Sequence, residues 1–166
     1  MSDLAGFLAE VERSKELAVK RFVEFQKSVA IAAFQMIAAD SRTVGMAYGS
    51  PVWSGYYRQN HNISIGEPNT SVRPPNPETV GPGATRWPDE PDRVLNAQPV
   101  SYAAQALQQL KPFDVVYITN ASPHAKRIEE GWSKFKAPEG VYAVTAEAVR
   151  ARFSKGSFNI LNNGGE

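Results

Sequence analysis

Apolar side chains recur at steps of three and four residues through residues 1–40, which places them on one face of an α-helix. They are Leu4, Phe7, Leu8, Val11, Ala18, Phe22, Phe25, Val29, Ala32 and Met36. A helix of about 36 residues is roughly 54 Å long, more than a domain of this size needs. We therefore expect a neighbouring subunit to cover the remaining apolar surface. A break near Ser14 or Ser28, giving two core helices, is the alternative.

The middle of the chain carries strand and loop signals. Residues 57–65 alternate loosely between polar and apolar side chains and end at Gly66, which predicts a strand. Eight of the 12 prolines then fall between residues 67 and 99, where they favour an extended, semi-rigid arm. Arms of this length are usually functional or disordered. Trp87 within the arm could anchor a partner or fold back onto its own sheet.

Helix and strand patterns resume after the arm. Helical spacing predicts a helix over 100–111, and a run of Val, Ile, Phe and Tyr predicts a strand over 113–119. A turn then begins a short helix that ends near Gly131, with Ser122 as its N-cap and Pro123 in its first position.

The last helix is predicted over residues 141–153, although its first residues could belong to a strand. The small polar segment 154–166 is expected to form a flexible tail. The chain is therefore predicted to be one α+β domain, residues 1–153, with the proline-rich arm inserted at 67–99.

Composition narrows the class of protein. The 166 residues suffice for one domain with a core, and 42% of them are hydrophobic, which excludes a disordered acidic chain. The formal net charge of +1 argues against a dedicated nucleic-acid binder. The absence of cysteine excludes disulfides and thiolate metal sites. The most apolar stretch, residues 29–39, is shorter than the ~20 residues of a membrane span, so no membrane association is expected.

No group of residues indicates catalysis. His61 falls in a predicted strand and His124 in the short helix, and neither has a metal-ligand partner at a useful spacing. Glu129 and Glu130 are adjacent, so on a helix they point about 100° apart and do not form an acid–base pair. We predict that the protein is not an enzyme and holds no metal or cofactor. An enzyme that uses either histidine is the alternative.

Basic residues gather in the C-terminal third, where residues 124–155 contain seven Lys or Arg and four Glu. A ring of subunits would multiply this modest charge around a DNA channel. The candidate channel-lining residues are Lys134, Lys136, Arg150 and Arg152. An ordinary solvated face of mixed charge is the alternative.

Two segments together resemble a known family. The first is Ser50-Pro-Val-Trp-Ser-Gly55-Tyr-Tyr-Arg58, and the second is Tyr117-Ile-Thr-Asn120-Ala-Ser-Pro123-His-Ala125-Lys-Arg-Ile128-Glu129-Glu-Gly131, followed by Ala137-Pro-Glu-Gly140. Their order, their spacing and the long helix before them are similar to those of tailed-bacteriophage neck proteins. These are the head–tail connector, or tail-completion, proteins related to minor tail protein Z of lambda-like phages.

The resemblance covers residues 1–66 and 100–153 and leaves out the proline-rich arm. His124 stands where the family usually has Tyr, Trp53-Ser54 replaces an acidic-Thr pair, and Tyr57 replaces Leu. Because these changes keep ring character or size, they are expected to trouble the fold little.

The resemblance implies a long N-terminal helix packed on a small antiparallel sheet, with a C-terminal helix. The matched residues suit scaffolding: glycines permit unusual backbone angles, prolines define turns, and Asn120 closes a turn. Glu129 is expected to pair with a basic neighbour such as Arg58. The full matched set is Pro51, Gly55, Arg58, Asn120, Pro123, Ala125, Glu129, Gly131, Pro138 and Gly140.

The resemblance further implies a structural virion protein. It would form a homo-oligomeric ring, six- or twelve-fold, that joins the DNA-filled head to the tail around the DNA channel. Its partners would be a head-completion or adaptor protein, a tail terminator or tail tube protein, and the genomic DNA in the lumen. It would reside in the virion neck, and in the host cytoplasm during assembly.

We expect the arm, residues 67–99, to dock onto an adjoining ring, with Arg73, Arg86 and Trp87 as its docking residues. A partner surface is what would order so proline-rich a segment. The alternative function is a DNA-binding accessory protein of genome packaging or retention.

Overall fold

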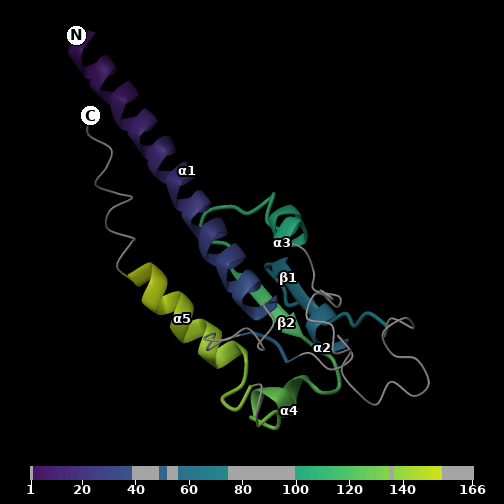
Figure 1. Ribbon diagram of the computed structural model, residues 1–166. Coiled ribbons are helices and arrows are strands. Elements are labelled where there is room, and N and C mark those ends of the chain that lie inside the picture. Colours follow the sequence, from purple (N-terminus) through teal and green to yellow (C-terminus); the bar gives the residue numbers. More distant parts are fainter. Residues whose placement is uncertain (1, 39–48, 52–55, 75–99, 135–136, 155–166) are drawn as a thin grey trace.

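The computed structural model describes residues 2–38, 49–51, 56–74, 100–134 and 137–154 (Figure 1). In chain order the elements are α1 (Ser2–Ala38), α2 (Tyr56–Gln59), β1 (His61–Ile65), α3 (Val100–Ala106), β2 (Val116–Asn120), α4 (Ala125–Glu129) and α5 (Tyr142–Ser154). The fold is α+β, as predicted. A long N-terminal helix, a small antiparallel sheet and a C-terminal helix make up its described part.

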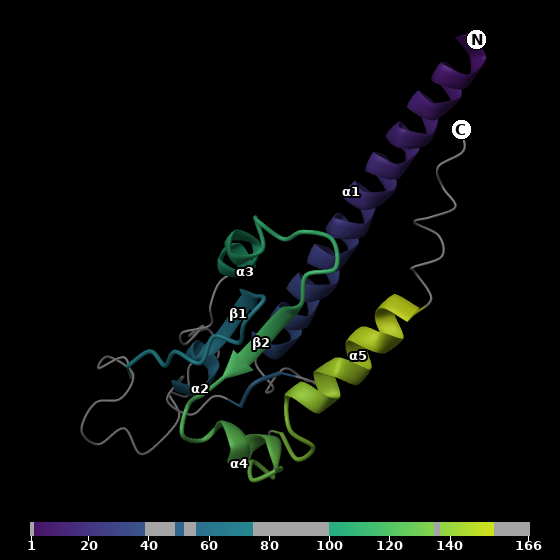
Figure 2. The same cartoon turned by 180° about the vertical axis from the view of Figure 1, so that it is seen from behind.

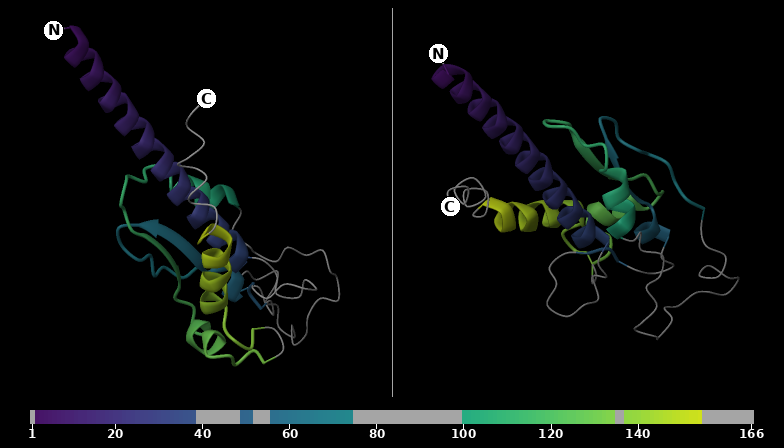
Figure 3. Two further views of the ribbon diagram at one scale, coloured as in Figure 1. Left: turned by 90° about the vertical axis from the view of Figure 1, so that its left-hand side faces the viewer. Right: turned by 90° about the horizontal axis from the view of Figure 1, so that it is seen from above.

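The helix α1 is continuous over 37 residues, so the alternative of a break near Ser14 or Ser28 is wrong. Ser28 lies within the helix, and its hydroxyl donates to the carbonyl of Glu24 at 2.8 Å. The C-terminal half of α1 lies against the rest of the domain, and its N-terminal half projects beyond the other described elements (Figures 1 and 3).

The sheet pairs β1 with β2 in antiparallel register, with Ile63 opposite Ile118. On one face it packs against α1 and α3 in a core of buried apolar side chains. These are Ala30, Phe34, Ala38, Ile63, Ala103 and Leu107. The three α1 residues of this core are spaced four apart, on a different face from the apolar stripe that the sequence singled out. In this part of the helix the stripe is buried as well, at Ala32 and Met36.

The predicted strand 57–65 is wrong in its first half, which forms the helical turn α2 before β1 begins. Tyr57 is drawn into a second apolar cluster with Ile37 and Val141. The backbone N–H of Asn60 then closes the turn on the carbonyl of Tyr57, at 3.1 Å. Burial of one aromatic ring against distant residues thus overrides the local alternation.

Three other boundaries differ from the prediction. The helix predicted over 100–111 ends at Ala106, and a turn follows it. The second strand begins at Val116 rather than 113, because Phe113 has a φ of 69° and turns the chain away from the extended conformation. The short helix α4 has His124 as its N-cap, not Ser122. The backbone carbonyl of Ser122 instead accepts the N–H of Ala125 at 2.9 Å, and the helix begins two residues later than predicted.

The last helix agrees with its prediction and is helical from Tyr142, so the strand alternative for its first residues is wrong. It runs beside α1, and Phe153 packs edge-on against Phe25 with ring centroids 5.9 Å apart. Among the described residues, no helix is both long and apolar enough to cross a membrane.

The proline-rich arm begins by covering the outer face of the sheet (Figure 2). Side chains of β1 and its approach bind arm backbone: Asn62 donates to the carbonyl of Ser71 at 2.7 Å, and Asn60 accepts the N–H of Arg73 at 2.6 Å. Thr119 of β2 donates to the carbonyl of Asn69. Polar side chains on the outer face of the sheet thus hold the first residues of the arm.

Candidate functional site

Several residues of the two motif segments contribute to two joints of the fold. The first, the α4–α5 joint, is made by the carboxylate of Glu129. It accepts the backbone N–H groups of Val141, Tyr142 and Ala143 at 2.9, 3.0 and 2.9 Å. These N–H groups lie at the start of α5, where they have no partner within the helix and where negative charge complements the helix dipole. Glu129 therefore caps α5 from the preceding helix.

Two glycines make this close approach possible. Gly140 has a φ of 82°, and a Cβ there would lie 2.7 Å from the carbonyl oxygen of Glu129 and 2.9 Å from its carboxylate. Gly131 has a φ of 80°, and a Cβ there would collide with the carbonyl oxygen of Pro138. Both the backbone conformation and the lack of space exclude a side chain at these positions.

Arg58 holds the end of another helix. Its Nε donates to the carbonyl of Ala38, the last residue of α1, where positive charge complements the helix dipole. The sequence suggested a basic side chain such as Arg58 as the partner of Glu129. The partners that the structure shows for Glu129 are backbone groups instead.

The second joint, the His61 joint, consists of Ser50, His61, Asn120 and Tyr142. The His61 ring is fully buried. Its Nε2 lies 2.7 Å from the Ser50 hydroxyl, and its Nδ1 lies 2.9 Å from the Tyr142 hydroxyl and 3.3 Å from the Asn120 amide nitrogen. The ring thereby connects both strands with α5 and with the segment that follows α1.

The hydrogen-bond directions in this joint can be assigned. Ser50 donates its one hydroxyl proton to the carbonyl of Ile37, at 2.6 Å. It must therefore accept the bond from His61, so Nε2 carries the imidazole proton and Nδ1 is an acceptor for Tyr142. Burial, with the Arg58 and Arg73 charges adding to it, lowers the pKa of His61 to about 3. The ring is neutral at physiological pH, as this assignment requires.

This arrangement is opposite to that of nucleophilic catalysis. A catalytic serine donates its proton to the histidine and is open to substrate. Ser50 is fully buried and gives its proton to Ile37. The chemistry available to the joint is that of a structural link between distant elements. The other histidine, His124, is exposed at the N-cap of α4 and makes no capping hydrogen bond through its side chain.

The remaining motif residues have local roles. Pro51 follows Ser50 and is half-buried, and Pro123 is exposed in the turn before α4. Ala125 begins α4 and packs against the cluster that contains Tyr57. Asn120 closes the turn as predicted, because its side-chain oxygen accepts the N–H of Ser122 at 3.0 Å. Gly55 lies outside the described residues.

The predicted docking residues of the arm are only partly described. Arg73 donates to the carbonyl of Gln59 at 2.8 Å and to the hydroxyl of Tyr102 at 3.2 Å, and its guanidinium lies over the Tyr102 ring. It therefore already has partners within the chain. Arg86 and Trp87 lie outside the described residues.

The predicted channel-lining residues are not gathered on one helix face. Lys134 is exposed after α4, whereas Arg150 and Arg152 belong to α5. Residues two apart on a helix point about 200° away from each other. Arg150 also forms an exposed ion pair with Glu147. Lys136 lies outside the described residues.

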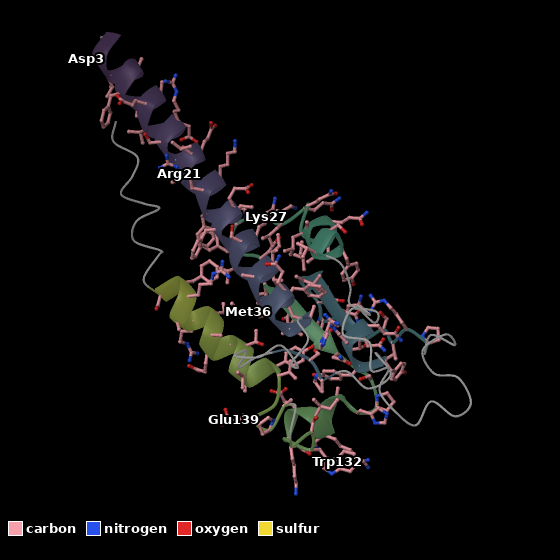
Figure 4. The ribbon with its side chains drawn as sticks, in the orientation of Figure 1. Asp3, Arg21, Lys27, Met36, Trp132 and Glu139 are labelled. Atoms are coloured by element: carbon pink, nitrogen blue, oxygen red, sulfur yellow. The ribbon has the colours of Figure 1, made fainter. Side chains whose placement is uncertain are left out.

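Among the described residues, the most exposed large apolar side chains lie at three places. Leu4, Phe7 and Leu8, on the projecting half of α1, are 66%, 60% and 58% exposed. Phe113, in the turn before β2, is 82% exposed. Trp132 lies at the opposite end of the molecule from the start of α1 (Figure 4) and is 71% exposed. Exposed apolar side chains that cluster in this way are typical of interaction surfaces.

Sequence reasoning missed the His61 joint and the Phe113 surface. Ser50, His61 and Tyr142 are far apart in the chain, and no spacing rule connects them. The part of the chain that the structure describes holds no group of three or more His, Asp or Glu residues that could bind a metal. Comparison with protein-family models, with curated proteins and with solved structures gives no match.

Proposed function

We propose that the protein is a structural subunit of the neck of a tailed bacteriophage. Copies of it form a ring that joins the DNA-filled head to the tail around the DNA channel. The observation that carries the proposal is the projecting half of α1 with its exposed apolar side chains (Figure 1). Exposing apolar surface of this kind to water costs free energy. That free energy is regained when a partner buries the surface.

The described motif residues support a scaffolding role. Glu129, Arg58 and the two glycines hold helix ends together, and Asn120 closes a turn. None of these groups is left free to act on a substrate. Their roles are to connect elements of the domain, which suits a scaffolding subunit.

The arm supports the proposal in a second way. Its first residues bind the outer face of the sheet through Asn60, Asn62 and Thr119. They therefore attach the arm to a defined place on the domain as far as Pro74. We assign the part of the arm that follows Pro74, rather than its first residues, to the contact with an adjoining ring.

The test is electron microscopy of a lysate from a phage that lacks the gene for this protein. DNA-filled heads beside separate, finished tails are the expected result, and the wild-type gene supplied in trans should restore joined particles. Intact, infectious particles would overturn the proposal. Empty heads would instead support the alternative, a DNA-binding protein of genome retention.

Deletion of residues 76–97 provides a second test within the same assay. The deleted chain should fold, because the described arm residues that bind the sheet, up to Pro74, are kept, but it should fail to join heads to tails. Joined particles with the deleted chain would remove the arm from the proposed contact. Circular dichroism of the purified chain supplies the control for folding.

A further inference from the structure

We propose that neighbouring subunits bind tip to base. The tip is the exposed start of α1, with Leu4, Phe7, Leu8 and Val11. The base is the apolar surface formed by Val19, Phe22 and Phe113. The inference rests on the proposed function, since it names the contact that builds the ring.

The tip is a single apolar face. Its four side chains follow the spacing i, i+3, i+4 and i+7, so they lie together on one side of the helix. All four are exposed. Together they present on the order of 400 Å² of apolar surface, which falls within the range of the largest apolar patches on ordinary monomers.

The base is an aromatic pair held in place by the backbone. The rings of Phe22 and Phe113 lie with centroids 4.9 Å apart, yet Phe113 remains 82% exposed. Its positive φ of 69° is rare and unfavourable for such a residue. Asp114 holds the turn by accepting the N–H of Lys111 at 2.8 Å, and Gln26 of α1 donates to the carbonyl of Asp114 at 3.3 Å. The chain thus maintains an unfavourable conformation that displays an aromatic ring to solvent.

Tip and base cannot meet within one chain. Leu4 and Phe22 are 18 residues apart on one continuous helix, which places them on the same face but about 27 Å apart. A second copy must therefore supply the tip that covers each base. A contact between two different surfaces of identical subunits is heterologous, and such contacts generate rings when the rotation closes.

The charges around the two surfaces are complementary. The first 12 residues contain Asp3, Glu10 and Glu12 and no Lys or Arg. The stretch of α1 that carries the base, residues 15–27, contains Lys15, Lys20, Arg21 and Lys27 against Glu16 and Glu24, and Lys111 and Asp114 stand beside Phe113, so the surroundings of the base are net positive. Figure 4 shows Asp3 at the start of α1 and Arg21 and Lys27 farther along it. Tip-to-base contact pairs opposite charges, whereas tip-to-tip and base-to-base contacts bring like charges together.

The size of the contact suits a ring better than an isolated pair. A stable interface buries about 800 Å² on each partner, and the tip offers roughly half of that as apolar surface. One contact alone is therefore weak. In a closed ring every subunit makes the contact twice, once through its tip and once through its base, and the last contact is intramolecular.

The first experiment compares two variants of the purified full chain in sedimentation velocity over a concentration series. The tip variant is Leu4→Gln, Phe7→Gln and Leu8→Gln, which keeps good helix formers on an exposed face. The base variant is Phe113→Asn, because Asn tolerates the positive φ. Trp132→Ser removes an equally exposed aromatic from the other end of the molecule and is the control. Wild type and control should assemble, and each variant should associate at least tenfold more weakly.

Mixing the two variants tests the direction of the contact. The tip variant keeps an intact base and the base variant keeps an intact tip, so one good contact remains between them. The mixture should form 1:1 pairs and nothing larger. Unchanged assembly of either variant alone, or the recovery of full assemblies on mixing, would contradict the proposal.

The absence of cysteine from the chain permits a direct test of proximity. Leu8→Cys in one preparation and Phe113→Cys in another should give a mixed disulfide dimer in excess of both homodimers. A double variant should give a ladder of multimers, because Leu8 and Phe22 are about 21 Å apart along α1, beyond the reach of a disulfide within one chain. Dominant Leu8→Cys homodimers would indicate tip-to-tip pairing and overturn the proposal.

Two further outcomes would contradict the tip-to-base contact. A wild-type chain that stays monomeric at every concentration and gives no mixed disulfide has no tip-to-base contact. A disulfide within one chain, between Leu8→Cys and Phe158→Cys, would show that residues 155–166 cover the tip instead. Either result leaves the neck function standing if the gene deletion separates heads from tails. Conversely, the purified chain could assemble tip to base while the phage that lacks the gene still gives normal particles. That result would support the tip-to-base contact and contradict the neck function.

Discussion

The two halves of α1 belong to one helix but differ in what surrounds them. Residues 3–20 are exposed throughout and include seven charged side chains, whereas residues 29–38 have no charged side chain and are largely buried. In the second half the helix is stabilised by tertiary packing on the sheet, α3 and α5. In the first half it is stabilised by its own residues, such as the Glu12–Lys15 pair, and by continuation from the packed half. Helix formation and burial are thus separate properties of this chain.

The largest expected difference between the halves is in stability. Phe34→Ala removes a fully buried ring from the core and should lower the free energy of unfolding by about 3–5 kcal/mol. Phe7→Ala removes an exposed ring from the projecting half and should change it by less than about 0.5 kcal/mol. Urea unfolding followed by circular dichroism measures both. Equal losses would mean that the projecting half is packed against something in solution.

The buried histidine is expected to make the stability of the domain depend on pH. His61 has its pKa lowered to about 3, so below pH 6.5 the unfolded chain binds a proton that the folded chain does not. Stability should therefore fall as the pH drops from about 6.5 toward 3, by about 1 kcal/mol per pH unit. His61→Gln should flatten this dependence. His124→Gln, at an exposed position, should leave it unchanged, and a flat wild-type profile would contradict the buried neutral ring.

Two adjacent carboxylates provide a smaller contrast. Glu129→Gln keeps the shape of the side chain but removes the charge that caps α5, and should cost about 1–2 kcal/mol. Glu130→Gln breaks only an exposed pair with Lys126 and should cost less than about 0.5 kcal/mol. Thermal unfolding of the two variants under identical conditions compares them. A larger loss at Glu130 would refute the capping role of Glu129.

The smallest effect is expected from removal of residues 2–14. These residues make no buried contact in the described structure, so the urea midpoint should stay within error of wild type. Association should nevertheless be lost, because the tip is gone. A large drop in stability would show that the projecting half contributes to the fold of the single subunit.

Several features could be predicted from local pattern. The period of apolar residues predicted α1 and α5, because helical structure depends on neighbours three and four positions away. Gly140 was expected to need an unusual backbone angle, and its φ of 82° agrees. Proline density predicted the arm, of which residues 75–99 lie outside the described residues. The start of β1 was misplaced, because the turn at Tyr57 depends on contacts with Ile37 and Val141, far along the chain.

The candidate site likewise has residues that the sequence predicted and residues that only the fold brings together. The motif pattern alone pointed to Asn120, Glu129 and Gly140, yet the ion pair suggested for Glu129 is replaced by three backbone bonds to α5. Nothing local connects Ser50 with His61 and Tyr142, which the fold brings within hydrogen-bond distance.

Local patterns of side chains were thus enough to predict an α+β chain with a long helix at its start, a proline-rich arm and a helix at its C-terminal side. The tertiary structure alone decided which length of α1 is buried. Ala32 and Met36 of the predicted stripe are buried together with Ala30, Phe34 and Ala38, whereas the tip, on the same stripe, is exposed. The tertiary structure also decided that Glu129 caps a helix and that His61 is neutral and buried. Helical period is a property of neighbouring residues, whereas burial, pKa and hydrogen-bond partners depend on residues that only folding brings together.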